Sequence, residues 1–306
     1  MTTLKQFIAS RQIRHLFGSS DRKRDKGQTT PADIIRYDDI LYGDDVKLKK
    51  WQYLDVYRPK AAVEADGSLK TLPVIISVHG GGWVYGDKEA YQWYCMRLSQ
   101  RGFAVVNFSY RLAPEAKFPA SMHDTEKVFQ FVADNAAQYG FDTNNVFAVG
   151  DSAGGHLLSL YAAALTNADL RKNFEFIKDK KLTLRGLGLN CGKYTLDDTD
   201  SKFRLLRSGF LPKGGTPDEV ELVNSANHVT KDFPPSFVMT CEGDFLKAQA
   251  PLMKAKLDAV GVRNELHCYG TPEQPLWHVF HCDPKLPIAV QCNDDECNFF
   301  RSLMNQ

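Results

Sequence analysis

Residues 145–154 read Asn-Val-Phe-Ala-Val-Gly-Asp-Ser-Ala-Gly, an apolar run that leads into a Gly-x-Ser-x-Gly pentad centred on Ser152. A run without Gly or Pro and typical of a helix follows at residues 156–165. A serine in this position lies on a tight, strained strand-to-helix turn, where side chains at the two flanking glycines would clash. The pentad therefore predicts a nucleophile elbow at Ser152. The alternative is a glycine-rich turn with an inert serine.

Short apolar runs and helical patterns alternate on both sides of this pentad. The predicted strands lie at residues 72–78, 103–108, 146–149, 184–189, 237–239 and 265–269, after an alternating pattern that starts at Trp51. Helices are expected at residues 4–17, at 122–139 with Gly140 as a left-handed end, at 251–261, and from Asn293, which has capping-box spacing to Glu296. This alternation predicts an α/β fold, a mostly parallel sheet with helices on both faces and its site at the carboxyl ends of the strands.

The composition excludes several classes of protein. The 306 residues have a net charge of +1 and are 43% hydrophobic, which is typical of a globular protein and argues against a nucleic-acid partner. No apolar run approaches the roughly 18 residues of a membrane span. The first 20 residues lack the apolar core of a secretion signal, and the seven cysteines include no Cys-x-x-Cys, so we expect a cytoplasmic location and reduced thiols. The charged run at residues 21–26 is expected to be a solvated loop.

A second motif, His79-Gly80-Gly81-Gly82-Trp83, follows the strand predicted at residues 72–78. Three successive glycines allow backbone N–H groups to converge on one point, as an oxyanion hole requires. A phosphate-binding loop is the alternative. It would need a Walker Lys-Ser/Thr pair or a Gly-x-Gly-x-x-Gly that opens a helix, and residues 80–86 supply neither convincingly, so we predict no nucleotide cofactor.

A nucleophilic serine needs a base and a carboxylate that orients the base, and in this fold both should follow the serine in the chain. Asp244 follows the strand predicted at residues 237–239 and is the predicted acid. Glu242 is the competing carboxylate, and capping a helix is the ordinary role of an aspartate placed like Asp244. His278 follows the last predicted strand and is the preferred base, with His281 as its competitor.

His278, His281 and Cys282 lie close enough in the sequence to raise the question of a metal site. No third ligand with a recognisable spacing accompanies them, and the chain has no His-Glu-x-x-His. We therefore predict no metal and no other cofactor.

Together these motifs make the chain similar to the hormone-sensitive-lipase-like group of α/β-hydrolases, which includes bacterial acetyl esterases and short-chain carboxylesterases. The resemblance covers roughly residues 72–280, with motifs in the family's order: His79-Gly80-Gly81-Gly82, Tyr110-Arg111-Leu112-Ala113-Pro114-Glu115 with Phe118-Pro119-Ala120, Gly150-Asp151-Ser152-Ala153-Gly154-Gly155, Phe233-Pro234-Pro235, Gly243-Asp244 and His278-Val279-Phe280. The resemblance implies a catalytic triad of Ser152, Asp244 and His278. It also implies an oxyanion hole formed by the N–H groups of Gly81, Gly82 and Ala153, with His79 steadying the glycine loop.

The chain departs from the family pattern around His278. The family usually has His-Gly-Phe there, preceded by Gly or an acidic residue, whereas this sequence has Val279 in the glycine position and Trp277 before the histidine. The resemblance also implies a helical cap, for which residues 1–45 and 194–229 are the candidates within a single domain spanning residues 1–306.

The resemblance favours hydrolysis of a small-molecule ester with a short, acetyl-like acyl group through an acyl-enzyme. We expect the walls of the substrate pocket to include Trp83, Tyr85 and Trp277, with Phe203, Leu205, Leu206 and Phe210 as candidates from the cap. The alternatives are a deacetylase of acetylated sugars, an arylformamidase-type amide hydrolase, and a catalytically inert receptor of the same fold, although such a receptor would lack the histidine. The sequence leaves open whether the chain forms a homo-oligomer.

Overall fold

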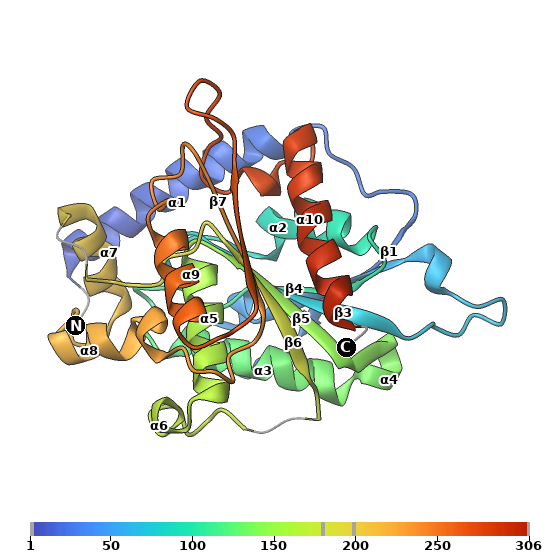
Figure 1. Ribbon diagram of the computed structural model, residues 1–306, viewed down its shortest axis with the longest axis horizontal. Coiled ribbons are helices and arrows are strands. Elements are labelled where there is room, and N and C mark those ends of the chain that lie inside the picture. Colours follow the sequence, from blue (N-terminus) through green and yellow to red (C-terminus); the bar gives the residue numbers. More distant parts are fainter. Residues whose placement is uncertain (1–2, 179–180, 198–199, 305–306) are drawn as a thin grey trace.

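The computed structural model describes residues 3–178, 181–197 and 200–304. Within these residues, eight strands form one sheet in the order β1-β2-β4-β3-β5-β6-β7-β8 (Figure 1). They are β1 (Ile34–Leu41), β2 (Tyr53–Pro59), β3 (Leu72–Val78), β4 (Ala104–Phe108), β5 (Phe141–Asp151), β6 (Leu184–Asn190), β7 (Ser236–Cys241) and β8 (Asn264–Tyr269). Among these strands β2 runs in the opposite direction to the other seven, so the prediction of a mostly parallel sheet is confirmed.

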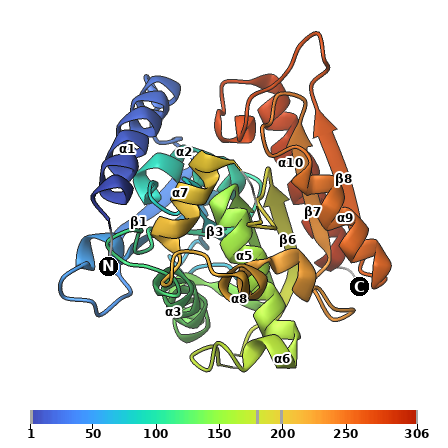
Figure 2. The same cartoon turned by 90° about the vertical axis from the view of Figure 1, so that its left-hand side faces the viewer.

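Helices cover both faces of the sheet (Figures 1 and 2). The α-helices are α1 (Leu4–Asp25), α2 (Lys88–Ser99), α3 (Ala120–Asp134), α4 (Ala136–Tyr139), α5 (Ala153–Thr166), α6 (Ala168–Arg171), α7 (Ser201–Phe210), α8 (Pro217–Val223), α9 (Gln249–Ala259) and α10 (Pro287–Met304). Short 3-10 turns are η1 (Lys49–Trp51), η2 (Lys60–Ala62), η3 (Ser225–His228) and η4 (Phe280–Cys282). None of the described helices combines the length and the apolar character needed to span a bilayer.

The apolar core forms one layer on each face of the sheet. Val74 and Ile76 of β3 pack in the layer that contains α3, α5 and α9, whereas Ile75 packs in the layer that contains α2 and α10. Successive side chains of a strand point to opposite faces, so a sheet covered on both sides buries every position of its central strands. This is why the central strands appear as continuous apolar runs in the sequence.

The helix predicted at residues 122–139 is confirmed as α3 and α4, and Gly140 ends it with the expected left-handed conformation (φ 60°). The predicted start of the last helix is wrong. α10 begins at Pro287, and both Asn293 and Glu296 are buried inside it. Glu296 Oε1 accepts a hydrogen bond from Asn190 Nδ2 at 2.8 Å. The buried glutamate therefore joins α10 to the sheet instead of capping the helix.

The prediction of a solvated loop at residues 21–26 is also wrong. α1 continues past residue 17 to Asp25. One turn apart on this helix, Asp21 and Arg24 form an ion pair of 3.1 Å, with side chains only 22% and 15% exposed. Opposite charges three residues apart lie on the same helix face, so their pairing is compatible with a helix and with partial burial.

The two predicted cap segments meet in space but are not entirely cap. Residues 34–41 of the first segment form the edge strand β1, which the sequence analysis missed because its face is partly exposed and its register shifts between Tyr37 and Ile40. α1 from the first segment and α7 from the second contact each other, and Gln6 Nε2 donates to Ser208 Oγ at 2.9 Å (Figure 1). Positions 1, 2, 198 and 199 of the two segments lie outside the described residues.

Candidate active site

Ser152 lies on the turn between β5 and α5. Its φ of 51° is in the left-handed region, where non-glycine residues are rare. A Cβ atom on Gly150 would lie 2.7 Å from the carbonyl oxygen of Gly154, and one on Gly154 would lie 2.0 Å from that of Val78. A side chain at either position would clash with backbone atoms, so both residues must be glycine. The turn has the strand-to-helix geometry of a nucleophile elbow.

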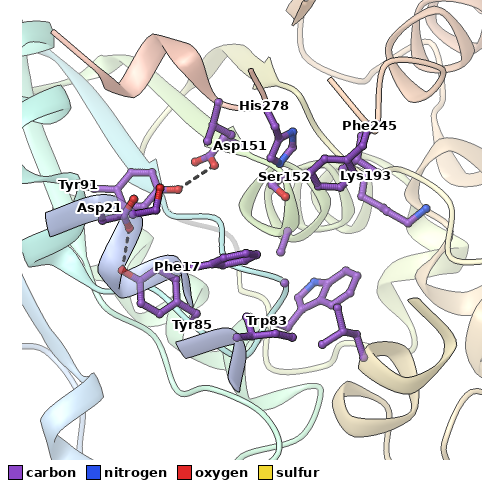
Figure 3. A pocket seen from close by; sticks show the side chains of 18 of the residues that line it. Phe17, Asp21, Trp83, Tyr85, Tyr91, Asp151, Ser152, Lys193, Phe245 and His278 are labelled. Atoms are coloured by element: carbon purple, nitrogen blue, oxygen red, sulfur yellow. Dashed lines mark hydrogen bonds between the residues drawn. The ribbon is translucent and has the colours of Figure 1, made fainter. Parts of the chain in front are cut away.

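Asp244 and His278 are brought together from two segments that follow neighbouring strands. His278 Nδ1 donates to Asp244 Oδ1 at 2.6 Å, and Asp244 also accepts from Thr240 Oγ1 and from the backbone N–H of Leu246. Burial raises the pKa of the Asp244 carboxyl, but these hydrogen bonds and the charge of His278 outweigh burial, so its pKa lies below the ordinary value. Figure 3 shows the His278 ring directed toward Ser152.

The two competing residues point elsewhere. Glu242 Oε2 accepts from Lys247 Nζ at 2.7 Å, whereas the carboxylate that accepts from His278 is that of Asp244. His281 is 1% exposed, and burial lowers its pKa to about 3. Of the two histidines, only His278 lines the pocket that contains Ser152.

The glycine loop lies beside Ser152 and lines the same pocket through Gly81 and Gly82, together with Ala153 from the start of α5. Gly81 has a φ of 110°, and a Cβ atom there would lie 2.2 Å from the carbonyl oxygen of Tyr85, so only glycine fits. His79 stacks on Tyr110 with ring centroids 4.0 Å apart, and its Nδ1 donates to the carbonyl of Gly80. Burial lowers the pKa of His79 to about 4, so the ring is neutral and holds the loop in place.

A buried hydrogen-bonded chain joins the glycine loop to the elbow. The hydroxyl of Tyr91 in α2 accepts from the N–H of Gly80 at 3.0 Å and donates to Asp151 Oδ2 at 2.8 Å. Burial raises the pKa of Asp151 to about 6, although the hydrogen bond from Tyr91 lowers it. Since Asp151 precedes Ser152, Tyr91 links the backbone of the glycine loop to the residue next to Ser152.

The pocket above Ser152 has a volume of about 290 Å³. Trp83 and Tyr85 line it, as expected from the sequence. The indole of Trp83 stacks on Phe210 of α7 at 4.8 Å, and its Nε1 donates to His156 Nδ1 at 3.1 Å.

The expectation that Trp277 walls this pocket is wrong. Its side chain is 76% exposed and is not among the residues that line the cavity. The backbone before His278 is tied to the end of β7, because the N–H of Gly243 donates to the carbonyl of Leu276 and Gly243 forms a parallel bridge with Trp277. This pairing turns His278 inward, next to Asp244, and leaves the preceding indole outside.

A family model described as BD-FAE matches residues 54–257, about two thirds of the chain. The chain belongs to the BD-FAE family.

This BD-FAE member is similar to several proteins that are named as esterases. Versiconal hemiacetal acetate esterase of Dothistroma septosporum is 28% identical over 237 residues, which cover 72% of this chain and 70% of that enzyme. Esterase LipC of Mycobacterium tuberculosis is 30% identical over 65% of this chain, but the match covers only 49% of LipC. A crystal structure of Esterase B from Lactobacillus rhamnosis, inhibited by a tributyrin phosphonate, has a TM-score of 0.89 and 25% identity, and covers 100% of this chain and 97% of that one. The resemblance to hormone-sensitive-lipase-like esterases and the α/β-hydrolase fold are thus confirmed, and the BD-FAE member is a carboxylic ester hydrolase.

Among the described residues of the BD-FAE member, two groups of side chains offer atoms that could hold a metal ion. Asp151, His281 and Cys282 place ligand atoms within 4.8 Å of one another, and so do Cys191, Asp244 and His278. The second group contains the hydrogen-bonded pair Asp244 and His278, which would have to separate to bind an ion. Sequence spacing missed both groups because their members come from different elements. That the chain uses no metal stays a prediction.

Several pocket residues carried little or no signal in the sequence. Phe203 and Leu206 of α7 were candidates from the cap and do line the pocket. Phe245 follows Asp244 directly, so its position could have been inferred from that of the acid. The pocket residues that were missed in α1 and α2 are Ile13, Phe17, Ser20, Asp21, Arg24 and Tyr91.

Proposed function

We propose that Ser152, Asp244 and His278 form the catalytic triad of an esterase that hydrolyses short-chain acyl esters through an acyl-enzyme. The 2.6 Å bond between His278 Nδ1 and Asp244 Oδ1, beside a serine held in a strained turn, carries the proposal. This arrangement gives each residue of a Ser-His-Asp triad its usual neighbour: a serine next to the imidazole and a buried carboxylate behind it.

In the first half-reaction, His278 Nε2 accepts the proton of the Ser152 hydroxyl as Oγ attacks the ester carbonyl carbon. The tetrahedral intermediate collapses, the bond to the alcohol oxygen breaks, and His278 returns the proton to the leaving alcohol. In the second half, His278 accepts a proton from water, the resulting hydroxide attacks the acyl-enzyme, and the acid leaves as Ser152 recovers its proton. Asp244 holds the imidazole by Nδ1 and stabilises its charged form.

The N–H groups of Gly81, Gly82 and Ala153 are the proposed oxyanion hole. All three residues line the cavity beside Ser152, and Ala153 is the first residue of α5, where backbone N–H groups have no partner within the helix. Donors of this kind stabilise the charge that develops on the carbonyl oxygen.

A short acyl chain is proposed from the size of the pocket. Its volume of about 290 Å³ is at the lower end of the range for small-molecule sites, roughly 300–1,000 Å³. The solved structure of Esterase B carries a phosphonate related to tributyrin, which makes acetyl and butyryl esters the first substrates to test. We expect kcat/KM for p-nitrophenyl esters to be highest between acetate and butyrate and to fall at octanoate. A maximum at long chains would contradict this part of the proposal.

Replacing Ser152 tests the triad. Ser152→Ala should reduce hydrolysis of p-nitrophenyl acetate by about 10⁴-fold or more, since the nucleophile is removed. The wild type should also be labelled covalently at Ser152 by a fluorophosphonate. Activity of the variant near that of the wild type would disprove the assignment, and a wild type that fails to react with the fluorophosphonate would favour an inert receptor of the same fold.

Two alternatives share the same chemistry and are separated by substrate. An arylformamidase-type enzyme should prefer an aryl formamide to the matching ester, and a sugar deacetylase should prefer acetylated sugars to simple acetates. We propose that α1 and α7 act as the cap that decides among such substrates. The cytoplasmic location and any homo-oligomer stay predictions from the sequence.

A further inference from the structure

The charged run that ends α1 contributes to the pocket wall. Asp21 and Arg24 line the same cavity as Ser152, and so does Ser20. These three residues come from a helix near the N-terminus, more than 120 positions away from the serine in the sequence. Charged side chains at such a place need partners, because the mostly apolar pocket offers little solvation.

Both charged side chains are held in fixed positions. Arg24 makes two hydrogen bonds to Asp25, at 2.7 and 3.0 Å, and a third to the carbonyl of Ala90 at 2.6 Å. Asp21 Oδ1 lies 3.1 Å from Arg24 Nη1, and Asp21 Oδ2 accepts from the hydroxyl of Tyr85 at 2.7 Å. The polar groups are therefore arranged before any ligand arrives, which lowers the cost of binding one.

These groups occupy one side of the pocket. Figure 3 shows Asp21, Tyr85, Tyr91 and Asp151 on one side of Ser152, next to the ring of Phe17, with Trp83, Phe245 and Lys193 on the other. We call the first set, together with Ser20 and Arg24, the polar side. The opposite side is mostly apolar, and even Lys193 lies with its Nζ 5.1 Å from the ring of Phe203.

The chemistry of the polar side fits a neutral hydroxyl group better than an ion. The carboxylate of Asp21 accepts hydrogen bonds, and the guanidinium of Arg24 donates them. Asp21 would attract an ammonium group that Arg24 repels, and Arg24 would attract a carboxylate that Asp21 repels, so the ion pair offers neither kind of ion a net attraction. A hydroxyl both donates and accepts, so it can bond to either member of the Asp21–Arg24 pair without adding charge.

An alkyl acyl chain belongs on the apolar side, among Trp83, Phe203, Leu206 and Phe245, because apolar walls stabilise it by burial. The alcohol part of the ester then lies on the polar side. Building on the proposed esterase function, we propose that the polar side binds a free hydroxyl group on the alcohol part of the ester, and that Asp21 determines this specificity. The substrate class is that of partially acylated polyols.

Two acetates of matched shape test the proposal. Glycerol 1-acetate carries two free hydroxyl groups, and 2-methylbutyl acetate replaces both with methyl groups. For the wild type, kcat/KM should be at least about tenfold higher for the glycerol ester, since a site built to bond a hydroxyl discriminates strongly against an analogue that lacks it. Equal rates on both esters would overturn the specificity and leave the esterase function intact, whereas no hydrolysis of either ester would refute both.

Substitutions of Asp21 test whether this residue determines the preference for the glycerol ester. Asp21→Leu should bring the ratio of the two kcat/KM values close to one. Asp21→Asn keeps the size and one acceptor oxygen and should give an intermediate ratio. Lys23→Leu is the matched control, because Lys23 lies on the same helix turn but is exposed and outside the pocket, and it should retain the wild-type ratio. A wild-type ratio in a folded Asp21→Leu enzyme would show that Asp21 is not the determinant, and the Asn variant gives the same test if the Leu variant does not fold.

Discussion

The floor and the roof of the pocket are held by different kinds of contact. The floor, defined as the Ser152 turn and the glycine loop at residues 79–86, depends on backbone atoms that leave no room for a Cβ at several glycines. The roof, defined as α1 and α7, depends more on side chains: Gln6 joins its two helices through Ser208, and Arg14 attaches α1 to Glu115. Backbone packing tolerates almost no substitution, whereas side-chain contacts can be exchanged. The floor is therefore suited to constant chemistry and the roof to variable substrate choice.

The largest effect is expected next to the floor, at the carboxylate that holds His278. Asp244→Asn should lower kcat by about 10³–10⁴-fold, because the amide cannot stabilise the charged imidazole and favours the wrong tautomer. Glu242→Gln is the matched control two residues earlier and should keep near wild-type kcat, since Glu242 pairs with Lys247. Steady-state kinetics on p-nitrophenyl acetate measure both. Loss of activity in Glu242→Gln with retention in Asp244→Asn would reverse the assignment.

A pair of alanine substitutions compares the floor with the roof directly. Gly154→Ala places a Cβ 2.0 Å from the carbonyl oxygen of Val78 and should cost about 3 kcal/mol or more of unfolding free energy. Gly209→Ala in α7 meets only Gln6, at 3.9 Å, and should be neutral or stabilise the helix by up to about 1 kcal/mol. Urea denaturation followed by circular dichroism gives both values. An equal loss of unfolding free energy at the two positions would contradict the difference between the floor and the roof.

A smaller effect is expected where a side chain supports the floor. Tyr91→Phe removes the hydroxyl between Gly80 and Asp151 and should lower kcat by about tenfold, because the glycine loop loses its anchor. The pKa of Asp151 should rise further, since the hydrogen bond from Tyr91 lowers it. Tyr94→Phe is the control: Tyr94 is also buried in α2, but its hydroxyl bonds to Glu296, so this variant should lose stability without loss of kcat. Steady-state kinetics across a pH range, giving kcat and kcat/KM for both variants, test these expectations.

The smallest effect is expected from the ion pair that attaches the roof. Burial raises the pKa of Glu115, but the hydrogen bond from Arg14 outweighs burial and leaves this pKa below its ordinary value of 4.5. The pair therefore stabilises the folded chain at neutral pH, and this contribution disappears as the pH falls through the lowered pKa. Glu115→Gln should cost less than about 1 kcal/mol at pH 7, since both side chains are partly exposed. The difference in Tm between variant and wild type should shrink from pH 7 toward pH 3; a constant difference would exclude this titration.

The strands predicted from the sequence were correct in the interior of the sheet, and a strand at its edge was missed. β3 was predicted to the residue, and β7 was found within three residues at each end, because central strands of a covered sheet are apolar at every position. The edge strand β1 was missed, since an exposed strand with a register shift has no such pattern. Asn293 and Glu296 were misread because their spacing fits a helix cap equally well, and only their tertiary partners distinguish the two roles.

For the site, the sequence by itself determined the elements of the floor. Steric limits at the Gly-x-Ser-x-Gly turn and the glycine loop act between residues that are close in the chain, so they leave a local pattern. Only the tertiary structure decided that His278 and not His281 faces Asp244, that Trp277 lies outside, and that Asp21 and Arg24 enter the pocket. These outcomes depend on side chains from segments far apart in the chain, whose meeting follows from packing and not from local spacing.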